Sequence, residues 1–132
     1  MKKIIFACVH SAGRSQMAAA FFNKHLSSSS ITAQAAGTDP AVQLHPEVVA
    51  VMLEVGIDLS AARPQLLTPE LAAQATLMVT MGCGENCPFV PGLKIIDWAL
   101  PDPKGKDLAV VRSIRDDIEQ RVIELITQNN WK

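Results

Sequence analysis

The chain has 132 residues, of which 48% are hydrophobic and 19% charged, and its formal net charge is −1. This composition is typical of one globular domain that buries a core, and it excludes a disordered chain. The charge is unlike that of a nucleic-acid-binding protein, and no apolar run approaches the ~18 residues of a membrane span. We expect one domain over residues 1–132, located in the cytoplasm, with neither nucleic-acid nor membrane partners.

The first predicted element is an apolar strand that ends at Cys8, followed by a short loop and a helix from Gln16 to Leu26. A loop that opens a helix presents unpaired N–H groups and a positive dipole end, so it can bind an oxyanion. The same groups favour the thiolate form of Cys8, and the Arg14 guanidinium adds a two-pronged donor. We predict Cys8 as the nucleophile and the following oxyanion-binding residues: Val9, His10, Ser11, Ala12, Gly13 and Arg14.

Two side chains in this loop region have open roles. Ser15 either donates its hydroxyl to the Cys8 sulfur or only starts the helix. His10 either tunes Cys8 or faces solvent. A cysteine at the end of an apolar strand is more often a small core residue. The spacing from Cys8 to Arg14, the glycine before that arginine and the strand–loop–helix context together indicate catalysis instead.

The later elements continue the alternation of strands and helices. In chain order we expect a strand over 31–36, a helix from Pro46 that ends at Gly56, a short helix from Thr68 to Gln74, strands over 76–81 and 94–98, and a helix over 108–126. This order predicts an α/β fold, a three-layer α/β/α sandwich with a four-stranded parallel sheet. Ligands bind beyond the carboxyl ends of such strands, so the loops after the first, third and fourth strands should meet.

The loop after the third strand contains Cys83 and Cys87, separated by three residues. They are either a reversible disulfide pair, half of a zinc site, or two unrelated thiols. Further zinc ligands would have to come from Cys8 and three scattered histidines, so we predict no metal site.

The loop after the fourth strand contains Asp102 between Pro101 and Pro103. A carboxylate on such a stiffened loop can act as a general acid toward a departing oxygen. An aspartate in a turn is very common, and spacing alone favours that structural role over the catalytic one.

The segment from Cys8 to Ser15 resembles the Cys-x5-Arg-Ser signature of the low-molecular-weight protein tyrosine phosphatase superfamily. Ser11 departs from it, because the superfamily usually has an asparagine there that helps to hold a left-handed backbone. Four further segments are similar to its arsenate reductase branch: Ser15-Gln16-Met17-Ala18, Ala36-Gly37-Thr38-Asp39-Pro40-Ala41, Gly56-Ile57-Asp58-Leu59-Ser60 and Met81-Gly82-Cys83-Gly84-Glu85-Asn86-Cys87-Pro88.

The resemblance implies a reaction for these residues. Arsenate, with phosphate or sulfate as mimics, binds the loop and Arg14, Cys8 attacks it, and Asp102 protonates a departing oxygen. Cys83 then forms a disulfide with Cys8, Cys87 takes over as the partner of Cys83, and thioredoxin reduces that pair without any bound cofactor.

Three alternatives remain beside this reductase. A phosphatase acting on phosphomonoesters would use Cys8, Arg14 and Asp102 without a second thiol. A reductase could instead be coupled to mycothiol or glutaredoxin, because the Cys-x3-Cys spacing is tighter than in the best-known thioredoxin-coupled members. The last alternative is a non-catalytic module that binds phosphate or a metal.

Overall fold

A computed structural model describes residues 2–26, 30–82 and 90–131. Its elements, in chain order, are β1 (Lys2–Cys8), α1 (Arg14–His25), β2 (Ile31–Gly37), α2 (Pro46–Glu54), α3 (Pro69–Ala73), β3 (Leu77–Thr80), β4 (Lys94–Asp97) and α4 (Leu108–Gln128). Each of them was predicted from the sequence. The first helix begins at Arg14 rather than Gln16, and the last ends at Gln128 rather than Ile126.

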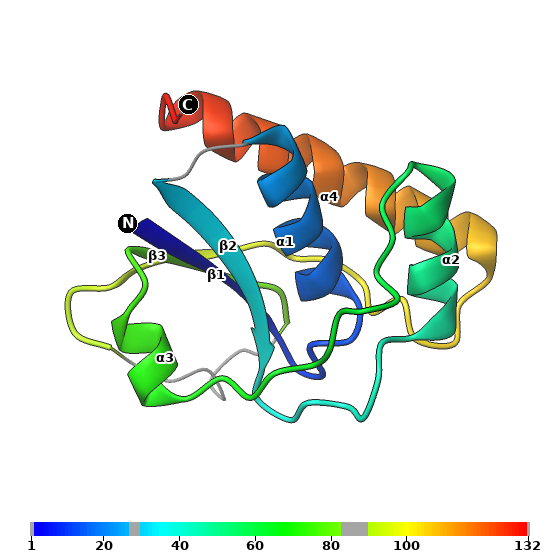
Figure 1. The fold of residues 1–132 in the computed structure, drawn as a ribbon, viewed down its shortest axis with the longest axis horizontal. Coiled ribbons are helices and arrows are strands. Elements are labelled where there is room, and N and C mark those ends of the chain that lie inside the picture. Colours follow the sequence, from blue (N-terminus) through cyan, green and yellow to red (C-terminus); the bar gives the residue numbers. More distant parts are fainter. Residues whose placement is uncertain (1, 27–29, 83–89, 132) are drawn as a thin grey trace.

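The four strands form one parallel sheet in the order β2-β1-β3-β4. Helices α1, α2 and α4 lie on one side of this sheet, with α2 beside α4, and α3 lies on the other side (Figure 1). The predicted three-layer α/β/α sandwich is therefore confirmed. Because β1 lies inside the sheet, its carboxyl end has a neighbouring strand on each side.

The alternation of side chains along β1 decides which way the cysteine points. Ile4, Phe6 and Cys8 belong to the core on the side of α1 and α4, whereas Ile5 and Ala7 belong to the core on the side of α3. Successive side chains of a strand point to opposite faces. Cys8 therefore lies on the same side of the sheet as α1, the helix that the chain enters next.

The long helix α4 is amphipathic and packs against α1 and α2. Its buried apolar residues recur every three or four positions, the period of one helix face: Val111, Ile114, Ile118, Val122 and Leu125. Acidic and basic residues occupy much of the opposite face. None of the helices among the described residues is both long enough and apolar enough to cross a membrane.

Candidate active site

The carbonyl groups of the loop after β1 all point toward neighbouring segments. The carbonyl oxygens of residues 8–13 accept, in order, from Thr38 N (3.2 Å), Asp39 N (2.8 Å), Ala41 N (2.9 Å), Gln16 Nε2 (2.9 Å), His45 N (3.0 Å) and Met17 N (3.0 Å). In a trans peptide the C=O and N–H groups point in opposite directions. The N–H groups of residues 9–14 therefore face away from these donors, an arrangement that suits an anion.

The Cys8 thiol lies at the base of this loop and is only 2% exposed. Its Sγ is 3.1 Å from the Oγ of Ser15, which is fully buried in the first turn of α1. A hydroxyl can rotate to donate or to accept. Ser15 therefore lies where it can donate to the sulfur once the thiol has lost its proton.

Arg14 is a buried cation at the N-terminus of α1. Its side chain is among the least exposed of the charged residues (6%), and Nη1 donates to the Leu100 carbonyl oxygen at 3.1 Å. Its buried Nε has no hydrogen-bond partner, and no carboxylate pairs with it, among the residues that the structure describes.

Another buried arginine, Arg115 of α4, shows the contrast. Its guanidinium pairs with Glu54 at 2.9 Å and with Asp116 at 2.9 Å, so its charge is compensated inside the protein. Burial of an uncompensated charge is costly, and a helix N-terminus adds further positive potential. The surroundings of Arg14 therefore favour a bound anion, whereas the charge of Arg115 is already balanced by Glu54 and Asp116.

The loop that carries Asp102 contacts the loop after β1. A Cβ built on Gly13 would lie only 2.9 Å from Cγ of Pro103, which is buried there. Asp102 itself is half-buried, and its Oδ1 accepts from Lys104 N at 3.0 Å. This bond fits the role of a turn aspartate. It uses only one oxygen of the carboxylate, so the position beside the loop also fits the role of an acid.

One histidine belongs to this loop and another lies beside it. His10 Nδ1 is 3.1 Å from the Asp39 carbonyl oxygen, and the rings of His10 and His45 are 6.4 Å apart in an edge-on arrangement. Burial lowers the pKa of His45 from its usual value, and the negative charges of Glu47 and Asp102 oppose that shift. Burial therefore favours the neutral form of the His45 imidazole.

The predicted residues Cys83 and Cys87 lie outside the described residues. Within the described ranges, no group of three or more histidine, cysteine, aspartate or glutamate side chains could hold a metal ion. His25, one of the histidines considered as a zinc ligand, instead bonds Glu119 at 2.8 Å.

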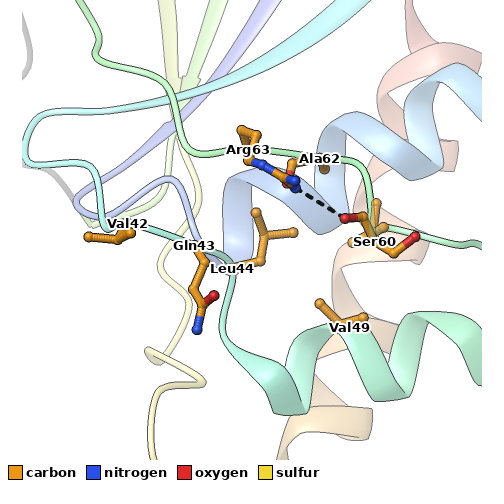
Figure 2. Close-up of a pocket in the computed structure, with 8 residues that line it drawn as sticks. Val42, Gln43, Leu44, Val49, Ser60, Ala62 and Arg63 are labelled. Carbon is orange, nitrogen blue, oxygen red and sulfur yellow. Dashed lines mark hydrogen bonds between the residues drawn. The ribbon is translucent and has the colours of Figure 1, made fainter.

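A cavity of about 420 Å³ lies beside the loop (Figure 2). One wall comes from residues 42–44 and 49, and the other from residues 59, 60, 62 and 63. The segments that form both walls are bonded to the loop or to the start of α1. His45 N donates to the Ala12 carbonyl, and Gln16 Nε2 donates to the Arg63 carbonyl at 3.1 Å.

Comparison with known protein families gives one match that covers almost the whole chain. The model of the low molecular weight phosphotyrosine protein phosphatase family matches residues 3–131. The chain belongs to this family. The assignment agrees with the parallel sheet and with a cysteine loop that opens a helix.

Several relatives of the protein have more specific names. It is 40% identical to a Halobacterium salinarum protein provisionally named an arsenate reductase, over 97% of this chain and 93% of that one. It is 35% identical to the glutaredoxin arsenate reductase of Synechocystis, over 97% and 98%. Among solved structures, the thioredoxin-dependent arsenate reductase of Corynebacterium glutamicum gives a TM-score of 0.83 at 36% identity. The match covers 97% of this chain but only 61% of that longer one.

Sequence reasoning missed three residues that shape the loop after β1: Gln16, Gly37 and His45. Gly37 pairs with Cys8 in the parallel register, and a glycine at the end of a neighbouring strand is a signal that could have identified it. His45 directly precedes Pro46, and on the sequence this position indicates only a helix-entry residue. Gln16 gave no signal, because a glutamine in the first turn of a helix is ordinary.

Proposed function

We propose that the protein reduces arsenate to arsenite at the loop after β1, residues 8–13, which we call the Cys8 loop. The observation that carries the proposal is the buried Arg14, which pairs with no carboxylate among the described residues and begins the helix that follows a row of N–H groups. The relatives named arsenate reductases, at 40% and 35% identity over nearly the full chain, support the same reaction.

In the first step the Cys8 thiolate attacks arsenic while the loop N–H groups and Arg14 hold the other oxygens. A sulfur–arsenic bond forms and one arsenic–oxygen bond breaks. Asp102 supplies a proton, so the departing oxygen leaves as water. Ser15, next to the sulfur, donates its hydroxyl to Cys8 whenever the thiolate is restored.

In the second step the Cys83 thiolate attacks the Cys8 sulfur. The Cys8–Cys83 disulfide forms, the sulfur–arsenic bond breaks, and its electron pair stays on arsenic, which leaves as arsenite. Cys87 then attacks the Cys83 sulfur, releasing the Cys8 thiolate and leaving a Cys83–Cys87 disulfide. An external dithiol, for which we propose thioredoxin, reduces that disulfide by two electrons.

The test is arsenate-dependent NADPH oxidation with thioredoxin and thioredoxin reductase, run beside glutaredoxin and mycothiol systems. We expect turnover with thioredoxin, and its loss in Cys8→Ser, Cys83→Ser and Cys87→Ser. Cys83→Ser and Cys87→Ser should still bind inorganic phosphate with the wild-type dissociation constant. Full thioredoxin-coupled turnover in either of these two variants would rule out the cascade, and turnover with only another donor would rule out thioredoxin.

Phosphomonoester hydrolysis is the second candidate, favoured by the name of the matching family. It would use Cys8, Arg14 and Asp102 and would not involve Cys83 or Cys87. A Cys83→Ser/Cys87→Ser double variant that keeps full hydrolysis of an aryl phosphate, beside a wild type inactive with arsenate, would favour this candidate.

A further inference from the structure

The tip of the Cys8 loop holds a serine in a backbone conformation that serine rarely adopts. Ser11 has a φ of 53° and is fully buried. L-residues with a side chain avoid this left-handed region unless their surroundings stabilise it. Something other than the intrinsic preference of serine must therefore hold the loop at this point.

The side-chain amide of Gln16 supplies such contacts. Its Nε2 donates to the Ser11 carbonyl oxygen at 2.9 Å and to the Arg63 carbonyl oxygen at 3.1 Å, and it lies 3.4 Å from Ser11 Oγ. A primary amide has two N–H donors, so these two carbonyls use both of them. Gln16 is itself only 7% exposed, so water competes little for these bonds.

The Arg63 carbonyl is a well-fixed acceptor. The Arg63 guanidinium folds back on its own turn, with Nη1 donating to the carbonyl oxygens of Ser60 at 3.1 Å and Ala62 at 2.9 Å (Figure 2). Two residues further on, Gln65 N donates to Ser11 Oγ at 3.3 Å. The segment after α2 is thus bonded to the loop tip both directly and through Gln16.

The bond to the Ser11 carbonyl has a consequence for the anion side of the loop. That carbonyl shares a peptide unit with the N–H of Ala12, and the two point in opposite directions. We propose that Gln16 is a positioning residue that keeps the Ala12 N–H turned toward a bound oxyanion without touching that anion itself. The inference rests on oxyanion binding at the loop, the first part of the proposed function.

The test is the dissociation constant for inorganic phosphate, measured by calorimetry on the reduced full-length protein. Gln16→Met keeps the length of the side chain and removes both donors. We expect its phosphate affinity to fall about tenfold, the effect of weakening one hydrogen bond to an anion. Gln34→Met is the matched control, because the buried Oε1 of Gln34 has no hydrogen-bond partner among the described residues. Its affinity should equal that of the wild type.

A rescue experiment separates positioning from general stability. Glycine adopts the left-handed region without strain, so Ser11→Gly/Gln16→Met should bind phosphate more tightly than Gln16→Met alone. Gln16→Asn, which keeps an amide but is too short to reach both carbonyls, replaces Gln16→Met if that variant does not fold. Wild-type affinity in the folded Gln16 variants, or no gain from the glycine, would overturn the proposal.

The phosphate dissociation constant, compared with arsenate turnover, distinguishes this proposal from the proposed function. A wild type that binds phosphate but does not reduce arsenate would refute the reductase and leave the role of Gln16 to be decided by the variants. A wild type that binds neither phosphate nor arsenate would refute both.

Discussion

Gly37 and Val9 are in direct backbone contact: a Cβ built on Gly37 would lie 2.5 Å from the Val9 carbonyl oxygen and 2.7 Å from Ser11 N. Hydrogen bonds of 2.8 Å from its N–H to the Gln65 carbonyl, and from Leu67 N to its carbonyl, hold Gly37 in place. Gly37 cannot move away from the Val9–Ser11 backbone, because its own hydrogen bonds hold it. The end of β2 therefore sets the path of the Cys8 loop.

Gly37→Ala should therefore displace the Cys8 loop. We expect phosphate affinity to fall at least tenfold, because the added methyl group pushes the Val9–Ser11 backbone and misaligns its N–H groups. Gly56→Ala is the control, since Gly56 has a φ of 83° but no atom within 4 Å of an added Cβ. It should lower stability by about 1 kcal/mol and leave affinity unchanged. Equal affinities in the two variants would contradict the prediction.

Replacement of Arg14 by lysine should weaken oxyanion binding more than it weakens the fold. Lysine keeps the charge but loses the planar fork, including the buried Nε and the bond from Nη1 to Leu100. We expect phosphate affinity to fall by about 10- to 100-fold. Arg115→Lys should show the reverse, with a lower melting temperature and wild-type affinity, because Arg115 pairs with carboxylates inside the protein. Similar affinity losses in both variants would argue against a special role for Arg14.

Asp102→Asn should slow turnover and spare binding. An amide cannot supply the proton for the departing oxygen, and loss of a general acid typically costs about 10²-fold or more in rate. The comparison is arsenate turnover against the phosphate dissociation constant, with Asp107→Asn, an exposed residue before α4, as the control. Unchanged turnover in Asp102→Asn would leave Asp102 as a turn residue only.

The ion pairs between α2 and α4 should make stability depend on pH. Hydrogen bonds from Arg112 and Arg115 lower the pKa of Glu54 from 4.5 to about 2. A carboxyl group with a lowered pKa in the folded state contributes stability above about pH 4.5 and loses it as pH falls toward 2.

Glu54→Gln should therefore have a lower melting temperature than the wild type at pH 7, and the difference should shrink between pH 4.5 and pH 2. Asp117→Asn serves as the control, because the Asp117–Arg121 pair joins residues within α4 and links no two helices. Melting curves at a series of pH values check this, and a difference that is constant across the range would refute it.

Much of the fold followed from local patterns. Residues 77–80 are buried on both faces of the sheet and 77–79 are apolar, as is typical of a central parallel strand. Thr68 caps α3 by accepting from Leu71 N at 3.0 Å. The start of α1 was misplaced by two positions, at Gln16 instead of Arg14, because its cap residue Gly13 makes no side-chain capping bond that a sequence motif could reveal.

The sequence by itself determined the class of fold and the spacing from Cys8 to Arg14, because both depend on residues close together in the chain. Only the tertiary structure decided that Gly37 touches Val9, that Gln16 joins Ser11 to Arg63, and that Arg115 pairs with carboxylates while Arg14 is left without one among the described residues. These contacts join segments that are far apart in sequence, and whether a polar group finds a partner depends on which segments fold together.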